Sequence, residues 1–338
     1  MIKRILFLVT IVLLLRTAGL SYSQDNSATQ EKTTADPLSL QNSSIPFYIG
    51  IADSNSIIIP FAVYANKAWS APWPVKWYNI SANEMPKNMY KSLGDIPESW
   101  YKPLADIPTL WHYSDIKGNP EVLNISRLEL VSCYCRERWA MVADTTKKTD
   151  VRRSGDYYRL SNTVFMVTSS HQFARNSETI QENSDEMYDI RTFLEPLFDK
   201  AEDNANHPKD SAVRSSTTMK FMNAVRNSSP HDGRLYYYIE ATKKYPGPGN
   251  LSTHFLSYMN GWIVRNSEGT FSFLKQEFHV YSNEMYLVSG DLVLGTIIID
   301  DNMYWIIIDR GYEGESYVLL QVSRDGVNRL LSISGGGC

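Results

Sequence analysis

Short runs of β-branched and aromatic residues recur along the chain and are separated by turn-forming residues. In the first third, the runs 47–51 and 56–64 flank the polar segment 52–55, a pattern that predicts a β-hairpin. Pro60 cannot donate a hydrogen bond to a neighbouring strand, so the second strand is expected at a sheet edge or with a β-bulge. Further strands are expected within 122–143 and 157–169.

The C-terminal third shows the strand pattern more regularly. Its strand-like segments are 235–239, 262–264, 270–280, 292–299, 303–308 and 317–322. Turn-forming residues at 266–269 and 301–302 predict tight hairpins between them. The runs 296–299 and 305–308 are apolar at successive positions, which is typical of a central hairpin covered on both faces. We therefore expect an antiparallel meander that forms a sandwich or a small barrel.

One segment has a helical pattern. Residues 178–203 contain nine acidic and two basic residues, and the apolar positions with helical spacing are Met187, Ile190, Leu194 and Leu197. This predicts one acidic amphipathic helix, with Asn183 as a candidate N-cap and a kink or break at Pro196. The polar segment 204–234, which lacks a sustained apolar period, is expected to be a long loop or an insertion.

These patterns predict a mainly β protein of the β-rich α+β class. Aromatic residues make up 12% of the 338 residues, which favours strands over a helical bundle. An irregular segment rich in tryptophan and proline extends from Trp69 to Trp111. The expected divisions are a signal peptide at 1–23, a disordered tether at 24–44, an N-terminal β-rich region at 45–177, the helix and polar loop at 178–234, and a C-terminal antiparallel β region at 235–338.

The N-terminus has the features of a secretory signal peptide. Lys3 and Arg4 precede the apolar run 5–15, and the small residues Ser21 and Ser23 predict cleavage after Ser23. A membrane anchor is the alternative, but the run is shorter than the roughly 20 apolar residues that span a bilayer. The protein is therefore expected to be secreted or periplasmic, with no membrane span after processing and an extracytoplasmic partner or surface that the sequence does not identify.

Charge argues against a nucleic-acid partner. The full chain has a net charge of −4, and removal of residues 1–23 takes away three basic residues and no acidic residue, so the processed chain has a charge of −7. Proteins that wrap nucleic acid carry basic patches instead. We therefore expect no nucleic-acid binding.

The three cysteines are Cys133, Cys135 and Cys338. In an oxidising compartment disulfides become possible, and Cys133 and Cys135 share a face if they lie on one strand. The glycines at 335–337 would let Cys338 reach either of them. A disulfide from the tail with one thiol left over is the preferred interpretation, and buried free cysteines or a metal site are the alternatives.

The sequence contains no motif typical of an enzyme or of a cofactor site. It lacks HExxH, the G-x-S-x-G elbow, the P-loop and the dinucleotide glycine pattern, so we expect no metal and no cofactor. Glu313 and Glu315 lie near a predicted hairpin end and could form a carboxylate pair of the glycosidase type. A polar turn is the preferred interpretation of this segment.

Two functions remain open at this point. The first is a non-enzymatic exported protein that binds a partner or a surface; the alternative is an exported hydrolase of polysaccharide or peptide that uses loop carboxylates. Exposed tryptophans could stack on sugars, but the same rings more often fill a core, which is the interpretation we favour. A pocket with two carboxylates would favour the hydrolase, and a flat aromatic patch would favour the binding protein.

Several segments carry a resemblance to a group of proteins. These are the first hairpin with 69–74, the stretch 95–100, Cys135 four residues before Trp139, and the ending formed by 311–317 and 335–338. In them the chain resembles a group of uncharacterised exported bacterial proteins that end in Gly-Gly-Gly-Cys. The resemblance implies secretion and a disulfide between Cys135 and Cys338. Cys133 departs from the pattern, which implies that it is the spare thiol.

We predict that peptide mapping without reduction of the exported protein will recover one peptide pair linked through Cys135 and Cys338. A disulfide between Cys135 and Cys338 would close a loop of about two hundred residues. It would stabilise the folded state by at most roughly 5 kcal/mol, because it restricts the unfolded chain. A Cys338 peptide that is linked to Cys133, or that migrates alone before reduction, would contradict the pairing. The Cys133→Ser variant is the control, since it should leave the linked pair unchanged.

Overall fold

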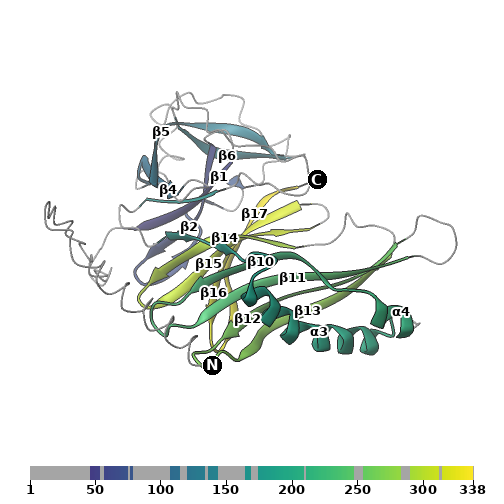
Figure 1. The fold of residues 1–338 in the computed structure, drawn as a ribbon. Coiled ribbons are helices and arrows are strands. Elements are labelled where there is room, and N and C mark those ends of the chain that lie inside the picture. The colour runs from purple at the N-terminus through teal and green to yellow at the C-terminus, as the bar shows by residue number, and fades with distance from the viewer. Residues whose placement is uncertain are drawn as a thin grey trace, which may run out of the picture. The chain divides into compact units, whose positions relative to one another are not determined.

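Strands form most of the part of the chain that the structure, a computed structural model, describes (Figure 1). This part comprises residues 46–53, 57–74, 77–78, 107–114, 120–133, 136–143, 164–168, 174–208, 211–246, 254–282, 290–311 and 314–337. The predicted signal peptide and tether, Trp100, Cys135, Cys338 and Glu313 lie outside the described residues. The mainly β fold class is confirmed, with antiparallel pairing throughout the described sheets.

The N-terminal sheet contains seven described strands. They are β1 (Phe47–Asp53), β2 (Ile57–Ala65), β3 (Ala68–Ser70), β4 (Leu110–Ser114), β5 (Pro120–Cys133), β6 (Arg136–Ala143) and β7 (Val164–Val167). Their order is β1-β7-β4-β5-β6-β2-β3, and β1 also pairs with β2. This last pairing closes the sheet on itself, as in a small barrel.

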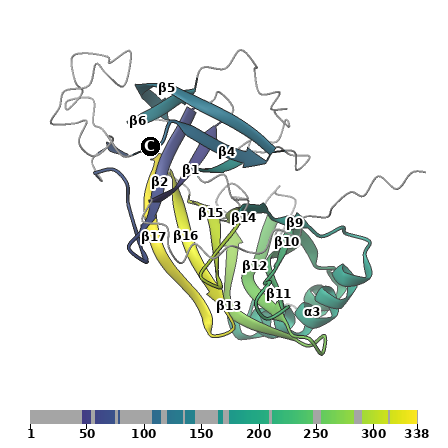
Figure 2. The same ribbon diagram turned by 90° about the vertical axis from the view of Figure 1, so that its left-hand side faces the viewer.

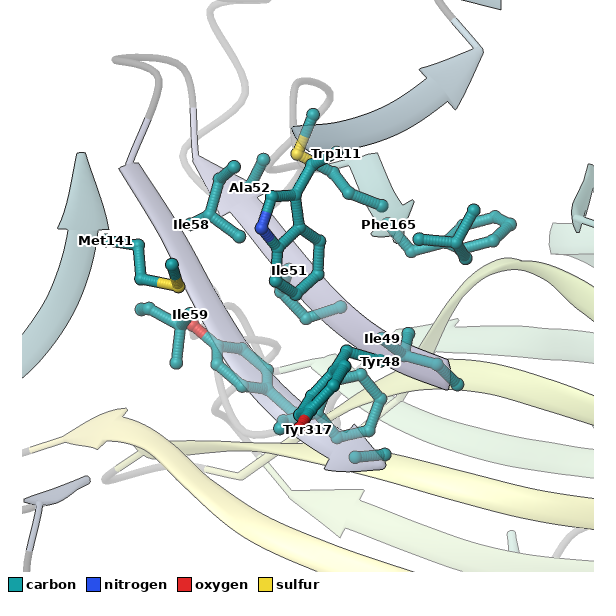
Figure 3. Close-up of a cluster of buried hydrophobic side chains, with 14 of the residues drawn as sticks. Tyr48, Ile49, Ile51, Ala52, Ile58, Ile59, Trp111, Met141, Phe165 and Tyr317 are labelled. Carbon is teal, nitrogen blue, oxygen red and sulfur yellow. The ribbon is translucent and has the colours of Figure 1, made fainter. Parts of the chain in front are cut away.

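The predicted first hairpin, formed by β1 and β2, shows the expected bulge at Pro60. Ile49 is opposite Ala62 and Gly50 is opposite Pro60, which leaves Phe61 as the extra residue. Gly50 has to be a glycine, because a Cβ atom there would lie 2.8 Å from a ring carbon of Trp111. Figure 3 shows Trp111 above this hairpin within the apolar cluster of the N-terminal sheet.

The centre of the middle sheet is buried on both faces. The sheet consists of β8 (Ala174–Asn176), β14 (Asp291–Ile299), β15 (Asn302–Arg310), β16 (Gly314–Ser323) and β17 (Gly326–Gly337), in the order β17-β16-β15-β14-β8. Ile306 and Ile308 pack in the core of the N-terminal sheet, whereas Trp305 and Ile307 pack on the opposite side. The prediction of a central hairpin covered on both faces is therefore confirmed.

The outer sheet packs against the second face of the middle sheet (Figure 2). It consists of β9 (Glu178–Thr179), β10 (Lys220–Ser228), β11 (Leu235–Pro246), β12 (His254–Arg265) and β13 (Phe271–Ser282), in the order β13-β12-β11-β10-β9. Tyr238 and Trp262 on this sheet meet Trp305 of the middle sheet in one apolar cluster. The predicted sandwich is formed by these two sheets.

The acidic helix covers the other face of the outer sheet. Helix α3 (Asp185–Ala205) buries its apolar stripe against that sheet through Met187, Ile190, Leu194 and Phe198. The helix is confirmed, but Ser184 caps it instead of Asn183, since its hydroxyl accepts a hydrogen bond from the Met187 amide at 3.1 Å.

The helix also continues through Pro196, so it is not split there, and the alternative of a kink stays a prediction. Buried side chains on both sides of the proline, Leu194 and Phe198, anchor the helix to the sheet. This packing offsets the lost backbone hydrogen bond.

The predicted loop at 204–234 is also wrong. This segment forms the short helix α4 (Ser211–Ser216) and strand β10. Because β10 pairs with both β11 and β9, its backbone is satisfied despite its polar composition. Its buried apolar side chains are Ala224 and Val225, one on each face, with Phe221 partly buried beside Ala224's cluster, which is too weak a pattern to recognise in the sequence.

The tryptophans that the structure describes in the irregular segment fill the core. Trp73, Trp77 and Trp111 are 2%, 3% and 0% exposed, which confirms the core interpretation for these three. The rings of Trp73 and Trp77 lie 5.6 Å apart. Within the described ranges, no helix is long and apolar enough to cross a membrane.

Two segments near the predicted disulfide meet in the fold. The guanidinium of Arg138, three residues after Cys135, donates a hydrogen bond to the carbonyl oxygen of Gly335, three residues before Cys338. It also lies over the ring of Tyr317, 5.4 Å from the centroid. The pairing of the cysteines stays a prediction, because both lie outside the described residues.

We predict that Trp305→Ala lowers the free energy of unfolding by about 3–5 kcal/mol, because it removes a large ring from the interface of two sheets. Trp305 is fully buried and meets Trp262 edge to face at 4.8 Å. Denaturant unfolding followed by circular dichroism measures the change. Val122→Ala, at a position that is 50% exposed, is the control and should change stability by less than about 1 kcal/mol. An equal effect of the two variants would contradict the assigned packing.

Candidate functional site

The space between the middle and outer sheets is apolar at one end and polar at the other. On β15, Trp305 and Ile307 face the outer sheet, and the next residue on that face is Asp309. On β11, Tyr238 is followed on the same face by Glu240. The polar end therefore occupies positions that continue the apolar stripe of each strand.

A cavity of about 200 Å³ lies at this polar end. Strands from both sheets contribute its lining, which consists of Tyr238, Asn260, Gly261, Trp262, Lys275, Gln276, Glu277, Gly290, Asp291, Asp309 and Arg329. Acidic, basic and amide groups all reach the cavity. It is therefore rich in hydrogen-bond donors and acceptors.

The register of the strands determines the positions of the carboxylates in this site. Asp291, at the start of β14, lies directly opposite Asp309 in the β14–β15 ladder. Glu240 lies opposite Asn260 in the β11–β12 ladder. Like charges in directly opposite positions destabilise a sheet, so the Asp291–Asp309 pair is not explained by strand pairing itself.

Tyr238 connects Glu240 with Asp291. Its hydroxyl donates a hydrogen bond to Oε1 of Glu240 at 2.8 Å and accepts one from the Asp291 amide at 3.0 Å. Gly290 leaves room for this arrangement, because a Cβ atom there would lie 2.5 Å from Oε1 of Glu240. A glycine is therefore needed beside the Glu240 carboxylate.

The basic side chains of the cavity already have acidic partners. Nζ of Lys275 lies 2.8 Å from Glu277, and Nη2 of Arg329 lies 2.6 Å from Asp309. The hydrogen bond from Lys275 lowers the pKa of Glu277. Each base is thus matched by one acid.

Glu240 and Asp291 are in a different electrostatic environment. Burial, and then the charges of Asp309 and Glu240, raise the pKa of Asp291 from its ordinary value to about 7. Burial also raises the pKa of Glu240, although Tyr238 and the charge of Arg310 act against this. Asp291 can therefore exchange a proton near neutral pH, as a general acid or base must.

The described residues provide no metal centre. No group of three or more histidine, cysteine, aspartate or glutamate side chains within them is arranged to hold a metal ion. The chemistry available to this cavity is hydrogen bonding, charge pairing and proton exchange at Asp291.

The site differs from the carboxylates proposed from the sequence. Glu315 lies opposite Arg310 in the β15–β16 ladder and packs against Gly335, where a Cβ atom would lie 2.9 Å from its Cγ. It does not line the cavity. Glu313 lies outside the described residues. Asp291 and Asp309 were not among the site residues predicted from the sequence. Each lies at the end of a long apolar run, and this position was the feature of the sequence that could have indicated them.

Comparisons with known proteins found no relative. No protein-family model, no curated protein and no solved structure matches this chain. The function therefore has to be inferred from the geometry of the cavity.

We predict that the Asp291→Asn variant is more stable than the wild type at pH 8 and about equally stable near pH 4. Because the folded-state pKa of Asp291 is about 7, against an ordinary value of 3.8, the folded protein binds the extra proton between these values. The contribution of this group to stability therefore falls as pH rises from 4 to 7. Denaturant unfolding at several pH values measures the difference.

The control for this experiment is Asp325→Asn, at an exposed turn where the side chain is 82% accessible. It removes the same charge and should leave the pH dependence of stability unchanged. An Asp291→Asn variant with the wild-type pH dependence would contradict the assigned environment.

Proposed function

We propose that this chain is an exported protein that binds a small polar ligand in the cavity between the middle and outer sheets. One observation carries the proposal. Lys275, Glu277 and Arg329 lie at the rim of the cavity with about half of each side chain exposed, but Glu240, Asn260 and Asp309 occupy inward-facing positions at one end of an interior that is otherwise apolar. Burial of such groups costs free energy unless they are paired, and apolar residues would give a more stable core. A concave site with converging polar groups and a shifted pKa is the usual setting of a ligand site.

The lining indicates what such a ligand has to offer. Asp291 and Asp309 can accept hydrogen bonds, whereas Lys275 and Arg329 can donate them. A cavity of about 200 Å³ accommodates a small molecule and not a folded partner. The ligand is therefore a compact molecule with several polar groups.

Binding through a flat tryptophan surface has less support. The described tryptophans are buried or half-buried, and Trp262 and Trp305 at the sandwich interface are 3% and 0% exposed. Their rings contact one another instead of solvent. The pocket thus replaces an aromatic surface as the proposed binding site.

An exported hydrolase is the second candidate, and the Asp291–Asp309 pair favours it. Asp291 has a pKa near neutrality and lies opposite a second carboxylate, as an acid–base pair requires. However, Asp309 is held by Arg329 at 2.6 Å, which reduces its availability as a base or nucleophile. For this reason ligand binding is the first proposal.

We predict that a screen of small sugars, amino sugars, amino acids and amines will include compounds that raise the melting temperature of the wild type, because a ligand that binds only the folded state stabilises it. Gly290→Ala should abolish this shift, since its new methyl group displaces the Glu240 carboxylate. Gly311→Ala is the matched control, because its Cβ atom would meet its nearest neighbour only at 3.4 Å.

Two results would contradict this proposal. Thermal shifts that persist in Gly290→Ala would place the ligand elsewhere. Release of products from polysaccharides or peptides by the wild type, lost in Asp291→Asn, would establish the hydrolase instead.

A further inference from the structure

We propose that the ligand of this cavity carries a primary ammonium group, which is held between Glu240, Asp291 and Asn260. The inference rests on the proposed function and specifies the chemical class of its ligand. It is argued from the charge balance of the cavity and from a buried polar atom, Oδ1 of Asn260, that lacks a partner in the described part of the chain.

The charge balance indicates a missing positive group. Lys275 is paired with Glu277, and Arg329 is paired with Asp309. Within the described lining, no further base remains for Asp291, and Glu240 lies directly beside it across Gly290. Arg310 attracts the Glu240 carboxylate from outside the lining. A cationic ligand would supply the charge that Asp291 lacks.

One polar atom points to a ligand independently of the acids. Oδ1 of Asn260 is buried without a hydrogen-bond partner among the described residues, although Asn260 lines the cavity. The neighbouring Tyr258, a side chain with no exposed surface, instead has hydrogen bonds with Glu240 and Tyr238. Burial, followed by the charge of Glu240, raises the pKa of its hydroxyl.

An ammonium group fits this set of acceptors. It has three N–H donors and no acceptor. The cavity lining provides the Asp291 carboxylate and Oδ1 of Asn260, and the Glu240 carboxylate lies next to Gly290 of the lining. Glu240 and Asn260 lie opposite each other on neighbouring strands, with both side chains on the face toward the middle sheet. A neutral hydroxyl would satisfy Asn260 but would leave the charge of Asp291 uncompensated.

Binding of an ammonium group is expected to depend on pH through Asp291. The titratable and charged groups around Asp291 are Tyr238 and Glu240 on β11, Tyr258 on β12, Lys275 and Glu277 on β13, Asp309 and Arg310 on β15, and Arg329 on β17. With a pKa of about 7, Asp291 is ionised at pH 8 and protonated at pH 5.5. An aliphatic ammonium stays charged across this interval, so its affinity should rise with pH.

The experiment uses two probes of equal size, ethanolamine and ethylene glycol, which differ by an ammonium in place of a hydroxyl. Ligand-observed NMR gives their dissociation constants with the wild type at pH 5.5 and pH 8. Ethanolamine should bind on the order of tenfold more tightly at pH 8 than at pH 5.5, and ethylene glycol should show no such change. Asp291→Asn should remove the pH dependence and weaken ethanolamine binding at pH 8.

A second variant separates a local effect from a general charge effect. Glu268→Gln changes the net charge by the same amount at an exposed position in the turn between β12 and β13, and should keep wild-type ethanolamine binding. Circular dichroism of Asp291→Asn checks that the fold is intact.

The outcomes distinguish this inference from the proposed function. Equal binding of the two probes, or unchanged ethanolamine binding in Asp291→Asn, would overturn the ammonium assignment. The proposed function would still stand if neutral compounds stabilise the wild type and not Gly290→Ala. If neither probe binds, the ammonium assignment fails and the Gly290→Ala screen decides the proposed function by itself.

Discussion

The hairpin of β14 and β15 is apolar at consecutive positions, so it has to be covered by protein on both faces. Ile306 and Ile308 on one face and Trp305 and Ile307 on the other would otherwise contact water, at a cost of about 2 kcal/mol for each large side chain. The N-terminal sheet covers the first face and the outer sheet covers the second. The outer sheet then presents its own second face, and helix α3 covers that face. The order of the layers follows from this one hairpin.

The candidate site lies at the end of the interface between the middle and outer sheets where apolar residues are followed by acidic residues. Asp309 follows Ile307 on the face toward the outer sheet, and Glu240 follows Tyr238 on the face toward the middle sheet. Two sheets that are held together by their apolar ends bring these acids close to each other at the opposite end. Asp291 is consequently buried beside other carboxylates, which explains its raised pKa. The rigid cores of the sheets thus position a site that neither sheet forms alone.

The sequence predicted strand positions well where β-branched and aromatic residues form short runs between turn residues, as in 303–308, and the helix where apolar residues recur every three or four positions. It failed at β10, whose partners β9 and β11 satisfy a backbone that its own polar side chains do not reveal. At Pro196 the sequence predicted a kink or a break, and helix α3 does not break there because its packing against the sheet outweighs the local preference. The site as a whole could not be predicted, since Glu240 belongs to a different sheet from the Asp291–Asp309 pair and meets it only through sheet stacking. The sequence indicated Glu313 and Glu315 instead, because they lie close together near a predicted hairpin end.

Ser177 lies between β8 of the middle sheet and β9 of the outer sheet, so a single residue links the two layers at one edge. Its amide donates to the Leu294 carbonyl, and its hydroxyl accepts a hydrogen bond from Asn227 at 2.8 Å. The link is therefore fixed to both sheets. The opposite edges, β13 and β17, carry Lys275, Glu277 and Arg329, which line the cavity. A ligand would therefore reach the cavity at the edge far from Ser177, past the half-exposed side chains of Lys275, Glu277 and Arg329.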